Sequence, residues 1–141
     1  EAEINNVVDQ LQQLKSEYQN QIESNFDLWE ISLKADFPSF EIISDRFHLN
    51  NDYANTGIKF SIDNQVYIAL IEWSKVDHPN LYFGIRKLPA QKSKYENSQP
   101  LENILSANDL KDSNDHWYGS KSASINSIFE DFKKLINSIE S

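Results

Sequence analysis

The sequence predicts an α+β domain: a long N-terminal helix, an antiparallel meander of about four strands, then a short helix and a C-terminal amphipathic helix packed on the sheet. Two patterns lead to this prediction. Apolar residues recur at helical spacing near both ends of the chain, and they alternate with polar residues in its middle. The 141 residues, 39% of them apolar, suit one domain with its own core. We expect a single domain over 1–141, with the long helix in 1–36, the sheet in 40–88 and a helical part in 100–140.

The first helix is predicted over residues 4–34 by a long apolar stripe. Its members follow three- and four-residue steps with one stutter, as in a coiled-coil seam: Ile4, Val7, Leu11, Leu14, Tyr18, then Ile22, Trp29 and Leu33. A helix of about 30 residues spans roughly 45 Å, which exceeds the width of a domain this small. Several arrangements are therefore open. The helix projects, pairs with another helix or joins this domain to something upstream, or it packs along its own sheet.

The strands are predicted over 42–49, 58–62, 65–73 and 81–87, separated by turn-forming residues. A loop rich in Asn, Asp and Gly is expected between 50 and 57. Asp63 and Asn64 tolerate positive φ and predict a two-residue hairpin turn. That turn sets Phe60 opposite Tyr67. Gly84 lies in the middle of a strand, which indicates close packing or a bulge.

The C-terminal part is predicted to be helical apart from an aromatic island at residues 116–119. A short helix begins at Pro100, and its buried side carries Leu101, Ile104 and Leu105. The last helix is predicted over 122–139, because a wide apolar stripe runs through it.

The charge and composition restrict the possible partners. The net charge is −9, and residues 1–58 hold 11 acidic and 3 basic residues, a balance of −8. This acidity argues against non-specific binding to nucleic acid or membrane. A local basic stretch at 86–94 leaves nucleic acid open as a partner. The longest apolar run has six residues, 66–71, so no membrane span is expected. The chain has no Cys, which favours the cytoplasm, and no Met, which favours a processed or excised piece.

Asp63, Glu72 and Lys75 are the candidates for catalysis. Metal-dependent nucleases hold a divalent cation with two carboxylates and place a lysine near the attacking water. In this sequence Glu72 and Lys75 are three residues apart, so a regular strand points them to opposite faces, and Asp63 lies in the predicted turn far from Glu72. The histidines His48, His78 and His116 lack the spacing of a metal site on one element. We therefore expect no catalytic residue, no metal site and no cofactor.

Tyr82, Arg86, Lys87 and Trp117 are the candidate binding residues. Aromatic rings next to cations grip extended ligands such as single strands. The alternative is that the aromatic residues fill the core between sheet and helices.

Several short motifs follow one another in the second half of the chain: GIKFSI at 57–62, IEW at 71–73, LYFGIR at 81–86, and Trp117 ahead of the last helix. Together they resemble the C-terminal half of certain bacterial PD-(D/E)XK nuclease superfamily proteins. The resemblance covers roughly residues 55–140. It implies an accessory region that lacks the catalytic motif, so no catalytic residue is carried over.

The function that follows is a non-catalytic accessory or interaction domain of a bacterial, nuclease-related protein. Its partner would be another protein or a second copy, contacted through the helix at 4–33. One alternative is a stand-alone acidic binding, inhibitor or immunity protein, which the acidic first 58 residues favour. The other is a metal-dependent nuclease that uses Asp63, Glu72 and Lys75.

Overall fold

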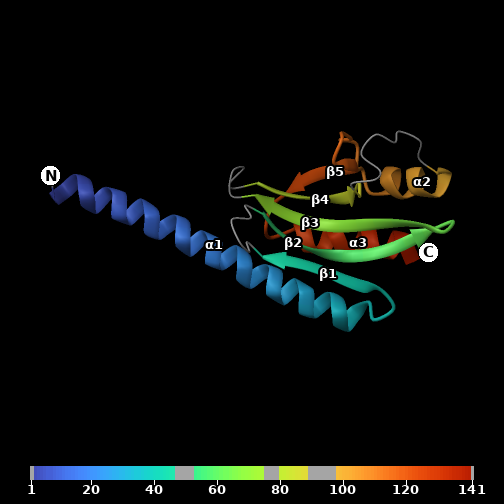
Figure 1. The fold of residues 1–141 in the computed structure, drawn as a ribbon, viewed down its shortest axis with the longest axis horizontal. Coiled ribbons are helices and arrows are strands. Elements are labelled where there is room, and N and C mark those ends of the chain that lie inside the picture. Colours follow the sequence, from blue (N-terminus) through green and yellow to red (C-terminus); the bar gives the residue numbers. More distant parts are fainter. Residues whose placement is uncertain (1, 47–52, 75–79, 89–97, 141) are drawn as a thin grey trace.

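The computed structural model describes residues 2–46, 53–74, 80–88 and 98–140, and these form an α+β fold, as predicted. Three helices and five strands follow one another along the described chain: α1 (Ala2–Asp36), β1 (Glu41–Arg46), β2 (Tyr53–Ile62), β3 (Gln65–Ser74), β4 (Leu81–Arg86), α2 (Gln99–Ala107), β5 (Trp117–Ala123) and α3 (Ile128–Glu140). The strands form one sheet in chain order, and every neighbouring pair is antiparallel. Figure 1 shows this meander with α1 beside it.

The β2–β3 hairpin confirms the predicted turn and register. Asp63 and Asn64 have φ values of 51° and 69°, which short polar side chains tolerate. Phe60 pairs with Tyr67. The predicted loop before it is wrong for residues 55 and 57, because β2 already begins at Tyr53. Within β2, position 57 is a glycine because a Cβ there would meet the carbonyl of Ala69 on β3.

The fifth strand was not predicted. Residues 117–123 pair with β4, and α3 begins at Ile128, later than the predicted start at 122. Glycine and serine give this segment a weak strand signal. Pairing with β4 and the packing of Tyr118 against Tyr67, with ring centres 5.5 Å apart, explain why it is nevertheless a strand. The first strand ends at Arg46 in the described chain, and the rest of its predicted span, 47–49, lies outside the described residues.

The short helix begins close to its predicted position. Ser98 caps it, since its hydroxyl accepts a hydrogen bond from the backbone N–H of Leu101 at 3.2 Å. Asn108, just after α2, donates to the hydroxyl of Ser138 on α3 at 3.2 Å, which ties the two C-terminal helices together.

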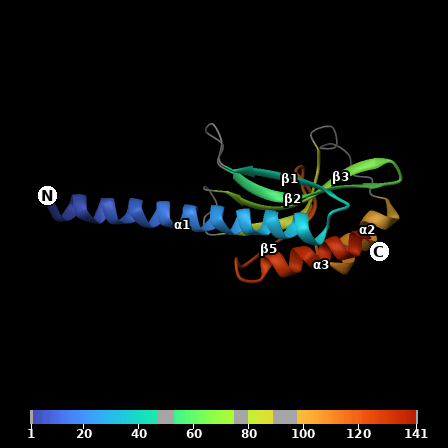
Figure 2. The ribbon, with the colours of Figure 1, turned by 90° about the horizontal axis from the view of Figure 1, so that it is seen from below.

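The core lies between one face of the sheet and the helices α1 and α3, which run side by side beneath it (Figure 2). The C-terminal half of α1 contributes four buried residues at helical spacing: Ile22, Phe26, Trp29 and Leu33. The ring of Trp29 stacks on that of Phe129 from α3, with centres 5.6 Å apart. Burial of these large rings fixes α1 against the domain.

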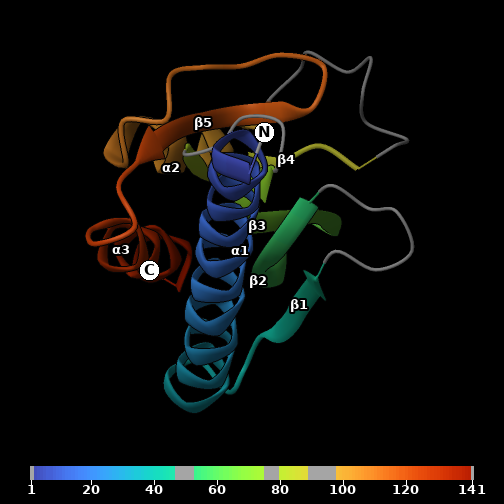
Figure 3. The same cartoon turned by 90° about the vertical axis from the view of Figure 1, so that its left-hand side faces the viewer.

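The N-terminal half of α1 projects beyond the sheet (Figures 1 and 2). Figure 3, which looks from the side of the N-terminus, shows α3 on one side of α1 and the strands β1 and β2 on the other. The first ring contact between α1 and the sheet is that of Tyr18 with Trp73, at 5.9 Å between ring centres. Before it, Val7, Val8, Leu11 and Leu14 are 47–60% exposed. The N-terminal half of the helix therefore projects and the C-terminal half packs along the sheet, which are two of the arrangements that the sequence left open. None of the described helices combines the length and apolar character needed to cross a bilayer.

Candidate functional site on the open sheet face

The face of the sheet opposite α1 and α3 carries the polar side chains of the central strands. In β3, Ile71 and Trp73 are buried in the core, so Glu72 between them points to the other face. In β4, Phe83 and Ile85 are core residues, and Arg86 follows on the open face. Alternation along the strands thus gathers charged and aromatic side chains on a face that none of the described helices covers (Figure 2).

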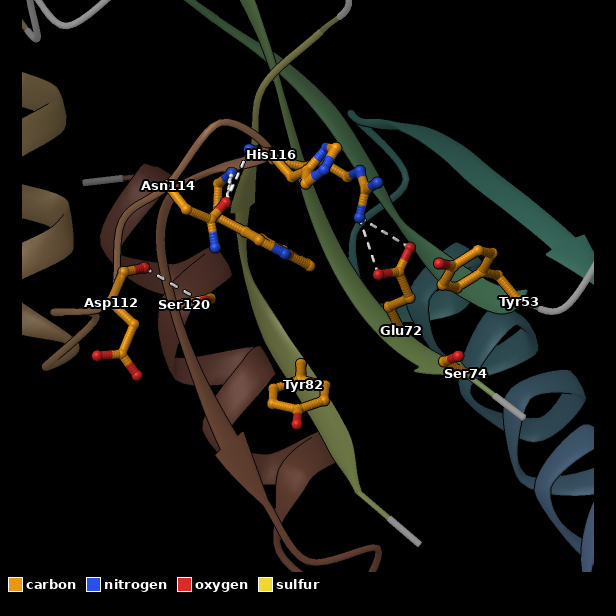
Figure 4. A pocket seen from close by; sticks show the side chains of 10 residues that line it. Tyr53, Glu72, Ser74, Tyr82, Asp112, Asn114, His116 and Ser120 are labelled. Atoms are coloured by element: carbon orange, nitrogen blue, oxygen red, sulfur yellow. Dashed lines mark hydrogen bonds and ion pairs between the residues drawn. The ribbon is translucent and has the colours of Figure 1, made fainter. Parts of the chain in front are cut away.

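A cavity of about 430 Å³ lies on this face. Four strands supply most of its lining: Tyr53, Glu72, Ser74, Tyr82, Arg86, Trp117 and Ser120. The segment before β5 supplies the remainder: Asp112, Asn114 and His116. Figure 4 shows Tyr53 beside Glu72 on one side of the cavity and Asn114 and Asp112 on the other. We call this feature the open-face cavity.

Gly84 keeps the cavity hollow. It lies between Tyr82 and Arg86 on the same face of β4. It pairs with Leu70 of β3 on one side and with Ser120 of β5 on the other. A Cβ at this position would meet the carbonyl of Gly119, so no larger residue fits without moving the strand. The mid-strand glycine therefore marks close packing of backbones, as the sequence indicated. The register also shifts between Ile85 and Arg86, where the pairing skips Tyr118 of β5, so this irregularity does not lie at Gly84.

Glu72 and Arg86 form an ion pair along the floor of the cavity. The Nη1 atom of Arg86 donates to both carboxylate oxygens of Glu72, at 2.9 and 2.8 Å. The two residues are not opposite in the register, since Glu72 pairs with Tyr82 and Arg86 with Ile68. The absence of a side chain at Gly84, between them, leaves room for the arginine to reach the carboxylate.

The electrostatics of Glu72 are set by burial and by two nearby groups. Burial raises the pKa of the Glu72 carboxyl above its ordinary value, while the charge and hydrogen bonds of Arg86, and the charge of His116, oppose that rise. The side chain of Glu72 is 12% exposed and that of Arg86 29%. The guanidinium also lies 5.2 Å from the ring centre of Trp117, a cation–π distance.

The wall beyond β5 is fixed by a short backbone bridge and a side-chain cap. Asp112 pairs with Ser120, whose N–H donates to the Asp112 carbonyl at 2.9 Å. The side-chain oxygen of Asn114 accepts hydrogen bonds from the N–H groups of His116 and Trp117, at 2.7 and 3.0 Å. These contacts hold the polar residues of the wall beside the sheet (Figure 4).

The structure brings together three of the four predicted binding residues. Tyr82, Arg86 and Trp117 all line the open-face cavity. Lys87 does not: it is buried, and its Nζ lies 5.4 Å from the ring centre of Tyr118, a core residue.

The structure does not bring Asp63 and Glu72 together. Asp63 lies in the β2–β3 turn, whereas Glu72 pairs with Asn55 seven positions beyond the closing pair of the hairpin. At about 3.3 Å per residue, that separation is roughly 23 Å. Lys75, His48 and His78 lie outside the described residues. Among the residues that are described, no group of three His, Cys, Asp or Glu side chains could hold a metal ion.

Sequence reasoning missed most of the cavity wall. Asp112, Asn114 and Ser120 belong to it only because β5 pairs with β4, and that strand was not predicted. Ser74 carried a usable signal, since it follows Glu72 by two residues and so shares its face.

Comparison of the chain with protein-family models, with curated proteins and with solved structures found no match.

Proposed function

We propose that this chain is a non-catalytic interaction domain that associates with a second copy of itself through the projecting half of α1. The observation that supports this is the exposed apolar stripe before Tyr18. Val7, Leu11 and Leu14 follow the three- and four-residue steps of a coiled-coil seam, and they are 54–60% exposed. Exposed apolar patches of this kind mark interaction surfaces.

The projecting half of α1 needs a partner for physical reasons. A helix of about 16 residues is marginal in water by itself, because most helical stability in proteins comes from packing of the apolar face. The described sheet supplies that packing only from Tyr18 onwards. A second helix packed against the stripe would bury Val7, Leu11 and Leu14 one after another along the helix.

The charge of this half favours another copy as the partner. Residues 2–17 hold three acidic residues and one basic residue, Lys15, a balance of −2. The surroundings of the stripe are mainly Asn and Gln, so two copies meet with little repulsion. The predicted link to nucleases and the alternative role as an acidic inhibitor remain predictions beside this proposal.

Sedimentation velocity over a wide concentration range tests the proposal. The wild-type chain should shift from monomer to dimer as concentration rises. Leu14→Lys places a charge in the seam and should weaken dimerisation about ten-fold or more. Ile31→Lys is the matched control, because Ile31 is as exposed, at 64% against 60%, and lies on the same helix about 100° around its axis from Leu14.

Two results would count against self-association. One is a wild-type chain that stays monomeric at every concentration. The other is an Ile31→Lys variant that loses dimerisation as fully as Leu14→Lys, which would show a general effect of charge on the helix rather than a contact of the stripe.

A further inference from the structure

The open-face cavity carries hydrogen-bonding side chains that the protein does not use itself. Among the described residues, no hydrogen bond or ion pair contacts the hydroxyl of Tyr82, the imidazole of His116 or the carboxylate of Asp112. Figure 4 shows no interaction drawn from these groups to the rest of the lining. They are therefore free to bind a ligand, and they surround it with both donors and acceptors.

The charges of the cavity favour an uncharged ligand. The lining holds one arginine, Arg86, two carboxylates, Glu72 and Asp112, and one histidine, His116, whose charge acts on Glu72. Arg86 is already paired with Glu72, at 2.8 Å. A phosphate or carboxylate ligand would share the guanidinium with Glu72, which already offsets its charge, and would face Asp112. A cationic ligand would face Arg86 on the floor. For either kind of charged ligand, the free energy spent on removing the charge from water and on repulsion by the like-charged group exceeds the attraction to the opposite charge.

The aromatic rings supply apolar contact surface next to the polar groups. Tyr53 is 44% exposed at one side of the cavity, and Tyr82 is half-buried in it. A ligand that fits has apolar C–H faces for the rings and several hydroxyl groups, each of which donates and accepts. Sugars combine these two properties in one small molecule.

We propose that the open-face cavity binds an uncharged sugar, a monosaccharide or a disaccharide. Its volume of about 430 Å³ falls within the range of small-molecule sites. The base of a nucleoside would offer only its edge to hydrogen-bonding groups, whereas most residues in this lining are polar and surround the cavity. The rings hold one face of the sugar, and Tyr82, Asp112 and His116 bind its hydroxyl groups.

Titration of the ¹⁵N-labelled chain with glucose, galactose, N-acetylglucosamine, maltose and cellobiose, followed by NMR, tests the proposal. At least one sugar should cause saturable shifts at Tyr82 and at the indole of Trp117. Tyr82→Phe keeps the ring and removes the hydroxyl, so it should weaken binding of that sugar about five-fold.

Asp112→Asn and Asp109→Asn form a matched pair for the same titration. Both remove one exposed carboxylate from neighbouring positions, and the left-handed backbone at Asp109, with φ of 57°, suits Asn equally well. Only Asp112 lines the cavity, so only its substitution should weaken binding, by about five-fold.

Three results would overturn the proposal. The first is that no sugar of the panel causes a saturable shift. The second is that a sugar binds equally well to wild type, Tyr82→Phe and Asp112→Asn. The third is that inorganic phosphate, putrescine or adenosine binds in the cavity more tightly than every sugar tested. None of these results touches self-association through α1, which sedimentation measures separately.

Discussion

Arg86 forms an ion pair with the buried carboxylate of Glu72. The free energy of unfolding that is lost in an Arg86→Met variant should therefore depend on pH. Burial already raises the pKa of Glu72 in the folded protein, and Arg86 limits that rise. A carboxyl whose pKa is higher in the folded than in the unfolded state destabilises the fold as pH rises through the interval between the two values. Removing Arg86 raises the folded pKa of Glu72 further, so more stability is lost and the loss extends to higher pH.

The size of the effect follows from the geometry of the pair. A hydrogen bond to a charged group contributes about 1.5–3 kcal/mol. Glu72 is 12% exposed, but Arg86 is 29% exposed and partly screened by water. We therefore expect Arg86→Met to lower the free energy of unfolding by about 2 kcal/mol near pH 8. Near pH 4, where Glu72 is protonated in both states, the cost should fall to about half that or less.

Glu72→Gln should cost less than Arg86→Met near pH 8. It leaves an arginine that is more exposed than the carboxylate, and water hydrates that arginine more easily. The double variant should recover part of the stability lost in Arg86→Met, because the amide that replaces the carboxylate carries no charge to bury. Urea-induced unfolding followed by tryptophan fluorescence gives all four free energies, and a ¹³C carboxyl titration gives the pKa of Glu72 with and without Arg86.

The pair Lys59 and Glu41 is the control for this cycle. It also joins two neighbouring strands, at 3.3 Å, but its side chains are 45% and 67% exposed. Its coupling free energy should not exceed about 0.5 kcal/mol. The reasoning is refuted if Arg86→Met costs the same near pH 4 and pH 8, or if the coupling of Arg86 with Glu72 is no larger than that of the control pair.

Three further substitutions and one control substitution test the packing by urea-induced unfolding. Phe26→Ala removes a fully buried ring from α1 and should lower the free energy of unfolding by about 4 kcal/mol. Leu28→Ala is the control at an exposed site on the same helix and should change that free energy by at most about 0.5 kcal/mol. Similar costs for the two variants would mean that α1 does not pack as described. Thr56→Val removes a buried hydroxyl that has no hydrogen-bond partner among the described residues and should raise the free energy of unfolding by about 1 kcal/mol. A clear loss of stability would instead show that the hydroxyl is hydrogen-bonded in the folded protein. Gly84→Ala forces a Cβ against the carbonyl of Gly119 and should lower the free energy of unfolding by about 2 kcal/mol. An unchanged stability would refute the close approach of β4 and β5.

The parts of the fold that sequence predicted correctly depend on local interactions. The β2–β3 hairpin follows from two adjacent residues, Asp63 and Asn64, whose side chains tolerate the required φ. Alternation on either side then fixes which residues face each other. The fifth strand depends on a distant partner, since its Gly and Ser residues have little strand propensity and β4 provides the pairing.

The candidate site also has one feature that the local sequence could predict and one that it could not. Arg86 and Glu72 are 14 residues apart, and their pairing depends on the register of β4 and on the missing side chain at Gly84. Nothing local in the sequence predicts that pairing. The separation of Lys87 from Arg86 was predictable, because adjacent strand residues point to opposite faces, and grouping the two on one surface overlooked this period of two.

The two halves of α1 differ in surroundings because the sheet is shorter than the helix. At 1.5 Å per residue the 35 residues of α1 span about 52 Å, whereas the ten residues of β3 span about 33 Å. The apolar stripe continues past the end of the sheet, so a helix that docks on the projecting half extends the core of the domain. Because α1 packs on the face opposite the open-face cavity, such docking leaves the cavity accessible (Figure 2). A dimer formed through α1 therefore presents two cavities to solvent, and binding of a ligand there should not compete with self-association.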